Sequence, residues 1–285
     1  MKKNNLLGML IILLLLTGCV FARYDEIELD ETFVITNGKL DVNADIDVGK
    51  VIIKRNNKAN ECQVYIKYLT ERANADIRFN EKHNVLDVIV DFENWKSWKE
   101  NTNESNTPKV IIELPYEPVL NLETNLKAGE FDLELGDLNL ESLDFNNWAG
   151  EATINFDLPN KMEMNNLDIN FKVGELKLLN LGNARFSEAD INSGIGELML
   201  DFSGENLEKA MARVDLDIGE TRVIIPEDIG AKLRVSKFLF LSQVTYPNWF
   251  EKRGRYYYSD NYNKSEKSLY LMISTGLGEL KIEVK

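Results

Sequence analysis

The sequence is poor in the residues that most metal sites and catalytic sites require. Its 285 residues include two cysteines, Cys19 and Cys62, and one histidine, His83. This scarcity excludes a zinc site built from cysteine and histidine within one chain. His83 is therefore the only candidate for a histidine-dependent catalytic triad. It lies in the polar stretch 80–84, which favours a hairpin turn over a catalytic role.

Positive charge is also in short supply. The chain has 33 Lys and Arg against 47 Asp and Glu, which gives a formal net charge of −14. A strongly acidic body repels nucleic-acid phosphates and anionic lipid headgroups, so we expect no nucleic-acid partner. Hydrophobic residues make up 44% of the chain, enough for a sizeable core. The acidity by itself indicates solubility, and it is also compatible with cations or a basic partner.

The first residues have the order of an export signal. Lys2 and Lys3 precede an apolar run from Leu6 to Leu16. That run is shorter than the roughly 20 residues a membrane-spanning helix needs, and it is typical of a signal peptide. An uncleaved N-terminal membrane anchor is the less favoured alternative.

The apolar run ends in Leu16-Thr17-Gly18-Cys19, which resembles the lipobox of bacterial lipoproteins. The resemblance implies cleavage before Cys19 and lipidation of its thiol. We therefore expect a signal peptide over 1–18, a lipidated Cys19 with a short linker over 19–30, and a protein anchored to the extracytoplasmic face of a bacterial cell membrane. Cys62, in the alternating segment 62–68, is expected to be a small buried hydrophobic residue.

A repeat is the main structural signal in the sequence. Six segments share a Gly-Glu pair that is followed by an apolar-x-apolar pattern, with Thr221 at the first apolar place in one of them, and they are spaced by 21, 24, 22, 23 and 59 residues. The pairs are Gly129-Glu130, Gly150-Glu151, Gly174-Glu175, Gly196-Glu197, Gly219-Glu220 and Gly278-Glu279. A second alternating segment, such as Leu167-Asp168-Ile169-Asn170, precedes most of them.

A period of about 22 residues accommodates two short strands and two corners. One such unit cannot bury its apolar face alone, whereas stacked units can. The repeat therefore predicts an all-β, single-domain β-solenoid of two-strand coils. An antiparallel meander is the alternative, but it would require Asn-Gly or Asp-Gly hairpin turns, which are scarce here.

Stacked coils would place the glutamates in a ladder made of Glu130, Glu151, Glu175, Glu197 and Glu220. Carboxylates about 5 Å apart repel by about 0.8 kcal/mol in water. Solvation together with the nearby Lys172 and Lys177 is the simpler way to relieve this repulsion. Bound Ca²⁺, which takes six to eight oxygen ligands, is the alternative. We expect no catalytic residues, and no metal or cofactor apart from this calcium alternative.

The two ends of the solenoid differ from the repeat. Residues 31–115 are rich in strand patterns and are expected to begin or cap the solenoid, with residues 47–50 as a degenerate first corner. Residues 116–285 hold the repeat and an aromatic-rich insertion, 232–270, which is expected to form a capping lobe. Three tryptophans in these regions are candidates for contact with a partner. They are Trp95, Trp98 and Trp249.

The repeat segments also carry a family resemblance. Residues 176–183 and 190–204, with the closing segments 258–262 and 275–278, resemble the toast-rack domain of bacterial surface proteins. That group is related to the LiaF-like cell-wall-active antibiotics response proteins and to adhesin-like β-solenoids. The resemblance implies an extracytoplasmic β-helical domain, and it supplies no catalytic residues to carry over. The lipobox departs from LiaF-like proteins, which have several transmembrane helices.

These features favour a membrane-anchored, non-catalytic binding or scaffold module of the cell envelope. Its partner would be an envelope glycan or a membrane protein. An envelope-stress sensor or regulatory module is the alternative. A polysaccharide-active enzyme is less favoured, because the ladder positions look alike and no carboxylate pair is set apart by its neighbours.

Overall fold

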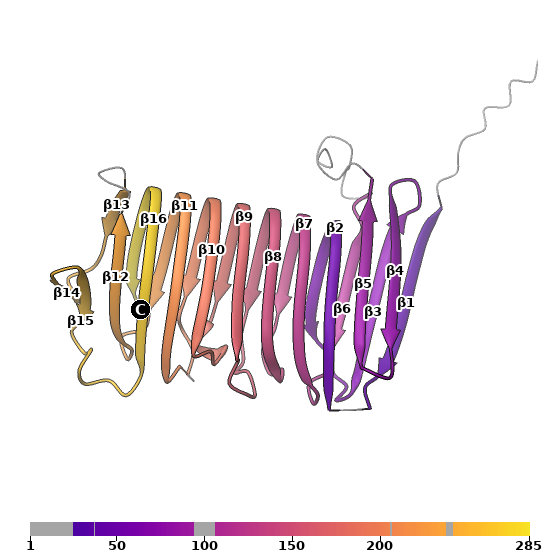
Figure 1. The fold of residues 1–285 in the computed structure, drawn as a ribbon, viewed down its shortest axis with the longest axis horizontal. Helices are drawn as coiled ribbons and strands as arrows, with labels where there is room; N and C mark the ends of the chain where they lie inside the picture. Colours follow the sequence, from indigo (N-terminus) through magenta and orange to yellow (C-terminus); the bar gives the residue numbers. More distant parts are fainter. Residues whose placement is uncertain (1–24, 37, 94–105, 206, 238–241) are drawn as a thin grey trace, which may run out of the picture.

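The computed structural model describes residues 25–36, 38–93, 106–205, 207–237 and 242–285. Their strands form one bent sheet of 16 strands, drawn out along the longest axis of the molecule (Figure 1). A short 3-10 helix, η2 (Leu181–Asn183), lies between two of the strands. Within the described part of the chain, no helix is both long and apolar enough to cross a membrane. Residues 1–18 and Cys19 lie outside the described residues.

Long strands that run parallel to one another form the body of the sheet. In spatial order the sheet runs β2-β7-β8-β9-β10-β11-β16, so β16 joins after β11 despite the long intervening segment. The strands are β2 (Lys39–Arg55), β7 (Val119–Glu134), β8 (Leu140–Asn155), β9 (Asn166–Leu179), β10 (Glu188–Asp201), β11 (Lys209–Ile225) and β16 (Ser268–Val284). Each strand supplies both legs of one coil, and the β-solenoid predicted from the repeat is confirmed.

The burial pattern shows why each long strand bends. In β7 the buried side chains alternate as far as Ala128, and the alternation then changes phase so that Phe131 and Leu133 are buried. A strand presents alternate residues to one face. When the buried positions shift from even to odd residues, the strand must bend so that both of its legs face the same core. The glycine of each Gly-Glu pair stands at this turn.

The corner glycines are stacked in register from coil to coil. Gly174 pairs with Gly150 on one side and with Gly196 on the other, and its φ is +133°. A Cβ at Gly174 would lie 1.9 Å from the carbonyl oxygen of Gly150. The corner therefore requires glycine both for its backbone conformation and for the close approach of the next coil. All six glycines predicted to form corners occupy this ladder.

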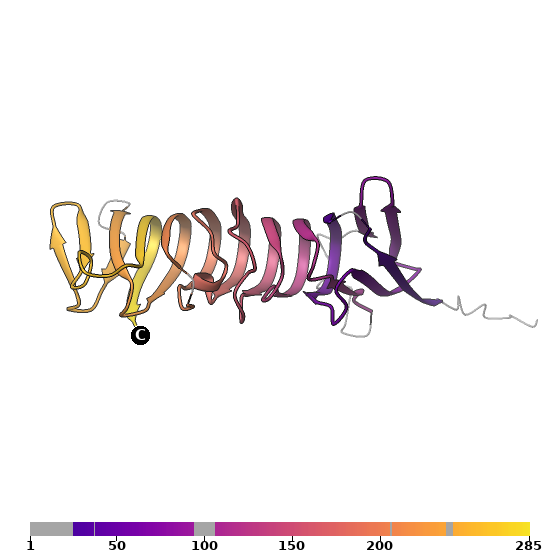
Figure 2. The same cartoon turned by 90° about the horizontal axis from the view of Figure 1, so that it is seen from below.

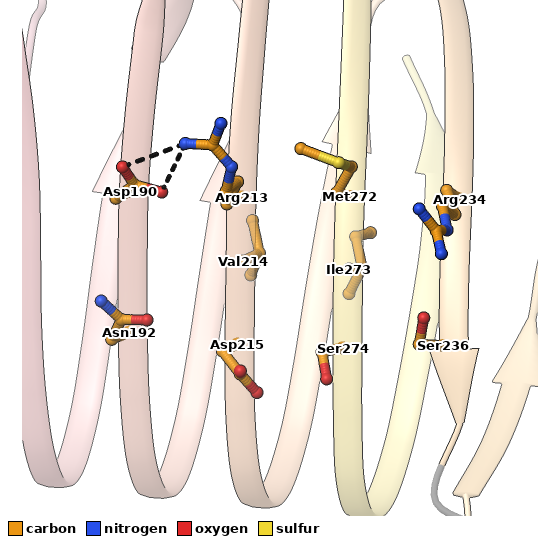
Figure 3. Close-up of a pocket in the computed structure, with 10 residues that line it drawn as sticks. All are labelled: Asp190, Asn192, Arg213, Val214, Asp215, Arg234, Ser236, Met272, Ile273 and Ser274. Atoms are coloured by element: carbon orange, nitrogen blue, oxygen red, sulfur yellow. Dashed lines mark hydrogen bonds and ion pairs between the residues drawn. The ribbon is translucent and has the colours of Figure 1, made fainter.

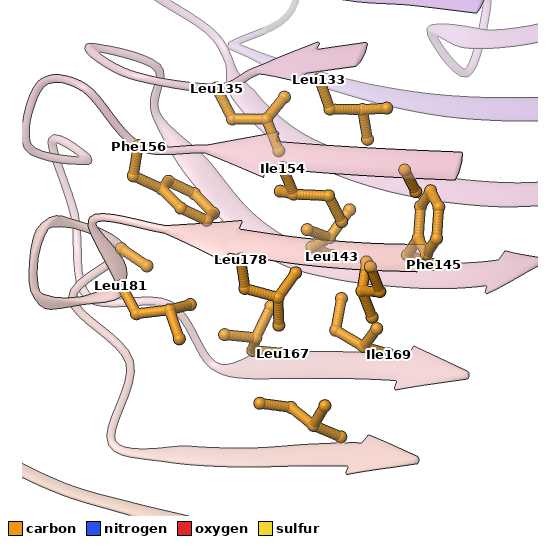
Figure 4. Packing of buried hydrophobic residues seen from close by; sticks show 14 of the residues in the cluster. Leu133, Leu135, Leu143, Phe145, Ile154, Phe156, Leu167, Ile169, Leu178 and Leu181 are labelled. Carbon is orange, nitrogen blue, oxygen red and sulfur yellow. The ribbon is translucent and has the colours of Figure 1, made fainter. Parts of the chain in front are cut away.

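Inward-facing leucine, isoleucine and phenylalanine side chains fill the space between the two legs (Figure 4). Phe145, Phe156, Phe171 and Phe202 are among the largest side chains that are fully buried. Burying a side chain of this size stabilises the fold by roughly 1.5–3 kcal/mol relative to exposure. The core therefore runs continuously through the coils.

At the N-terminal end, the coil next to β2 is assembled from two separate strands. β5 pairs with the first leg of β2, and β6 pairs with the second leg. Gly49 of β2 pairs with Gly129, so the degenerate first corner is confirmed. Antiparallel strands complete this end. The strands at this end are β1 (Glu26–Val34), β3 (Glu61–Leu69), β4 (Ala73–Asn80), β5 (Val85–Phe92) and β6 (Lys109–Leu114).

At the C-terminal end, the coil next to β16 is likewise assembled from two separate strands. β12 (Gly230–Lys237) and β13 (Ser242–Thr245) pair with the first and second legs of β16. β15 (Tyr256–Ser259) pairs antiparallel with β12, and β14 (Phe250–Arg253) pairs with β15. Figure 2 shows this segment beyond β16, so it covers the last coil as a capping lobe would.

Candidate functional site

The predicted glutamate ladder exists and is one residue longer than expected. Glu151, Glu175 and Glu197 lie side by side on β8, β9 and β10, and the parallel register places Glu130 and Glu220 beyond them. Glu279 of β16 extends the ladder. At the opposite end Lys50 takes the glutamate position, and its Nζ lies 3.1 Å from Oε2 of Glu130.

Lysine side chains relieve part of the repulsion within this ladder. Lys177 Nζ lies 2.6 Å from Glu175 Oε1. That hydrogen bond, with the charges of Glu175, Glu151 and Glu197, raises the pKa of Lys177. Solvation with Lys177 is thus the interpretation that the geometry supports, whereas Lys172, also expected to help, forms no ion pair with the ladder among the described residues. Among the described residues, no group of three or more His, Cys, Asp or Glu is arranged to hold a metal ion, and calcium binding stays a prediction.

Two further ladders cover the outward surface of the first legs. In the first, Glu123, Asp144, Asp168 and Asp190 are aligned from β7 to β10. Burial and the charges of Glu123 and Asp168 raise the pKa of Asp144, against a hydrogen bond from Asn146 that lowers it. We call this row the acid ladder.

The neighbouring row is an amide ladder, made of Asn125, Asn146, Asn170 and Asn192. Asn170 Nδ2 donates to Asn146 Oδ1 at 3.1 Å, and Asn192 Nδ2 donates to Asn170 Oδ1 at 3.2 Å. These bonds hold the amides in fixed orientations along the solenoid. The acid and amide ladders together form a flat polar surface on rigid strands.

Toward the C-terminal end the chemistry of both ladders changes. The acid ladder continues from Asp190 as Arg213, Met272 and Arg234 on β11, β16 and β12. The amide ladder continues as Asp215, Ser274 and Ser236. These residues line an open groove of about 300 Å³, which we call the C-terminal groove (Figure 3). Its lining is Asp190, Asn192, Arg213, Val214, Asp215, Arg234, Ser236, Met272, Ile273 and Ser274.

The two arginines of the C-terminal groove differ in their partners. Arg213 Nη1 donates to both carboxylate oxygens of Asp190, at 3.2 and 3.3 Å. Arg234 makes no hydrogen bond, ion pair or ring contact with any residue that the structure describes. Burial, and secondarily the charge of Asp217, raises the pKa of Asp215, while a hydrogen bond from Ser274 lowers it. Arg234 is thus the cation of the groove that has no partner among the described residues, and it lies among hydroxyl and carboxylate groups.

The remaining residues singled out from the sequence lie apart from this groove or outside the described chain. Trp249 is partly buried against the core, and its ring meets Phe250 edge-on with centroids 5.1 Å apart. Its role in partner contact stays a prediction. Cys19, Trp95 and Trp98 lie outside the described residues.

Cys62 and His83 have the structural roles expected of them. Cys62 is fully buried, and burial, helped by the charge of Glu113, raises the pKa of its thiol to about 12. The thiol is therefore unreactive at neutral pH. His83 is exposed in the turn of the antiparallel β4–β5 hairpin.

Sequence reasoning missed the C-terminal groove and an apolar ridge. Val173, Ile195, Ile218 and Leu277 precede the corner glycines, stack in register, and are between 40% and 49% exposed. The signal for the ridge was present, because each of these residues precedes a Gly-Glu pair. The groove gave no such signal, because its arginines come from strands that do not belong to adjacent repeats.

Two family models match the chain. The model described as "N-terminal domain of toast_rack, DUF2154" matches residues 23–178. The model described as "Cell wall-active antibiotics response LiaF, C-terminal" matches residues 173–282. Among proteins with curated descriptions, no match was found.

Several solved structures are similar to this chain. A candidate cell adhesion protein from Clostridium sporogenes is 19% identical, with a TM-score of 0.45, over 90% of this chain and 100% of that one. Candidate adhesins from Bacteroides fragilis and Parabacteroides merdae are 9% and 10% identical, with TM-scores of 0.35 and 0.36. Each of these alignments covers 90% of this chain, and they cover 96% and 95% of the respective adhesins.

Proposed function

Because this chain belongs to the toast-rack family, we propose that it is a non-catalytic binding module of the bacterial cell envelope. The observation that carries this proposal is the outward surface of the first legs, where acid and amide ladders run in register over β7 to β10. Stacked coils keep such a surface rigid and extended, which suits a long, repetitive partner.

Anchoring through Cys19 would place this surface at the membrane. Two or more acyl chains hold a protein stably on a bilayer, whereas one chain is marginal. Mass spectrometry of the mature protein from membranes of the producing cells tests the anchor, and the expected N-terminal residue is a triply or doubly acylated Cys19. Cys19→Ala should release the protein from the membrane fraction. An intact Met1 in the mature protein would contradict lipidation.

Binding to the envelope is tested by sedimentation of the full chain with purified cell-wall sacculi. We expect the protein to sediment with the sacculi at physiological ionic strength. Asp168→Lys with Asn170→Lys, which reverses the charge at the centre of the two ladders, should weaken that binding. Glu81→Lys, in the exposed turn near His83, adds positive charge elsewhere and is the control. A protein that stays in the supernatant would overturn the proposal.

A second candidate function is a regulatory role in the envelope response. The match of residues 173–282 to the C-terminal region of LiaF favours it. In this role the solenoid would act through a membrane protein, and photo-crosslinking in intact cells would identify that partner. Recovery of one membrane protein as the main product would favour regulation, whereas crosslinks to wall polymer alone would favour the binding module.

A further inference from the structure

Charge is distributed unevenly along the solenoid. Residues 25–206 contain 17 Lys and Arg against 36 Asp and Glu, whereas residues 207–285 contain 13 against 11. Because β11, β16 and β12 to β15 all come from the second part, the C-terminal end is nearly neutral on an otherwise acidic body. An anionic group is therefore repelled from most of the molecule and least from this end.

Tyrosine rings lie next to the C-terminal groove on the same surface. Lys232 Nζ lies 4.4 Å from the ring centroid of Tyr256, 4.9 Å from that of Tyr270 and 5.9 Å from that of Tyr258. Contacts of this kind attract a cation to the ring face. They hold the rings around Lys232, and we call these three tyrosines with Lys232 the tyrosine platform.

The platform and the groove are joined through β12. Lys232 and Arg234 alternate along this strand, so their side chains leave the same face. Arg234 is also the register partner of Tyr256, and Lys232 is that of Tyr258. The guanidinium of Arg234, the hydroxyl groups of the groove and the rings of the tyrosine platform therefore lie near one another on one sheet.

The positions of the two arginines set the length of this surface. Arg213 and Arg234 occupy the same ladder with Met272 between them. Two strand spacings separate them by about 10 Å. That spacing suits a linear ligand which crosses the strands, and Arg234 is the arginine free to bind a negative charge on it.

We propose that the C-terminal groove and the tyrosine platform bind an acidic sugar polymer. Arg234 receives a carboxylate or phosphate of the polymer, because a guanidinium matches the geometry of both groups. Tyr256, Tyr258 and Tyr270 receive the apolar faces of the sugar rings, and Ser236, Ser274 and Asp215 bind their hydroxyls. This inference rests on the proposed binding function and adds to the acid and amide ladders a separate site for an acidic polymer of the envelope.

Polygalacturonate tests the proposal, with its fully methyl-esterified form as a neutral polymer of the same backbone. Isothermal calorimetry with the full chain should show binding of the acidic polymer and weaker binding of the ester. Phosphomannan, a polymer whose sugar rings carry phosphate, tests phosphate as the anion, and binding of it in place of polygalacturonate also supports the proposal. Phosphatidylglycerol vesicles test a membrane surface, and binding to vesicles but to neither polymer would overturn it.

Arg234→Gln should weaken binding of the acidic polymer about tenfold, as expected for loss of a charge-assisted hydrogen bond. Arg222→Gln is the matched control, since Arg222 is an exposed arginine of β11 paired with Glu283 outside the groove. Equal weakening by both variants would indicate general charge attraction and overturn the site. Tyr258→Leu, which removes a flat ring and no charge, should also weaken binding, and unchanged binding would refute the platform's role.

Sedimentation with sacculi separates failure of this inference from failure of the proposed function. A chain that binds sacculi but neither acidic polymer would overturn the ligand and leave the binding function standing. A chain that binds neither sacculi nor polymers would overturn both. Thermal unfolding of each variant checks that a loss of binding does not reflect a loss of fold.

Discussion

At the scale of single residues, the corner glycines make the sharpest demand on the sequence. Gly174→Ala should destabilise the protein by about 3 kcal/mol or more, because strain and overpacking at a packed position each cost about 1–3 kcal/mol. The added methyl group meets the Gly150 carbonyl oxygen in a φ region that suits only glycine. Chemical denaturation followed by circular dichroism measures the change.

Gly254→Ala is the matched control for this substitution. Gly254 also has a positive φ, +63°, but a Cβ there would meet no atom within 4 Å. It should cost only about 1 kcal/mol, the usual penalty for a left-handed non-glycine residue. If both variants were equally stable, the stacking of the corners would not depend on the close approach of their backbones.

A buried amide offers a stabilising substitution. Asn147 is 1% exposed, and neither its Nδ2 nor its Oδ1 has a hydrogen-bond partner within the described residues. Its register neighbours are Leu126 and Phe171. Burying an unsatisfied amide costs about 1–3 kcal/mol, so Asn147→Val should raise the free energy of unfolding by a similar amount.

The outward-facing Asn170 is the comparison for Asn147, and both variants are measured by urea denaturation. Asn170 donates to Asn146 and accepts from Asn192, so Asn170→Val removes two hydrogen bonds. This variant should be less stable than the unmodified protein. A destabilised Asn147→Val variant would mean that the core requires the amide.

At the scale of the element, each coil is an interchangeable unit. Asp168 and Asp190 occupy equivalent positions on β9 and β10, so deletion of residues 168–189 joins Leu167 to Asp190 in register. The shortened solenoid should fold and unfold cooperatively with lower stability, because stability in repeat proteins is roughly a sum over units and their interfaces. Calorimetry and far-ultraviolet circular dichroism measure both properties.

Deletion of residues 168–178 provides the contrast, because it removes most of both legs of β9 and the Gly174 corner but leaves the connection to β10, and so does not restore the register. This variant should lose cooperative unfolding. If both deletions unfolded alike, the coil would not be the structural unit.

At the scale of the element, the sequence predicts the repeated coils but not the coils at the two ends. Glycine corners and alternating legs repeat along the chain because each coil meets the same local requirement, so they predict the stack and the glutamate ladder. The coils at the two ends could not be predicted from the sequence in this way. β5 and β6 form one coil from segments separated by residues 93–108, and β16 comes between β11 and β12 in space but not in sequence. Arg213 and Arg234 therefore lie on either side of Met272, and no local sequence pattern predicts the strand pairing that places them there.

At the scale of the whole molecule, the excess of acidic residues couples stability to pH. Burial raises the pKa of Asp45, Glu134, Asp144 and Asp215 in the folded state. The folded state then holds these protons more tightly than the unfolded state does, and it is penalised at pH values above the raised pKa. Stability should rise as the pH falls through the raised values toward the ordinary 3.8 of Asp and 4.5 of Glu.

Glu283 opposes this trend only at lower pH. Hydrogen bonds from Lys281 and Arg222 lower its pKa, so its contribution to stability is present above the ordinary value of 4.5 and is lost as the pH falls through the lowered one. Between pH 8 and the ordinary Glu value of 4.5, the raised carboxyls should therefore decide the sign of the pH dependence. The melting temperature should rise by about 2–4 °C over this interval, equivalent to about 1 kcal/mol for a domain of this size.

Calorimetry at constant ionic strength measures the effect, and Asp144→Asn tests its origin. Asp144 lies between Glu123 and Asp168 in the acid ladder, so this variant removes a carboxyl whose pKa is raised and relieves both neighbours. Its melting temperature should be higher at pH 8 and should change less with pH. Glu81→Gln, in the exposed β4–β5 turn, removes the same charge away from the ladder and should leave the slope unchanged. A melting temperature that fell steadily from pH 8 to 4.5 would show that ion pairs, rather than crowded carboxylates, dominate the electrostatics of the solenoid.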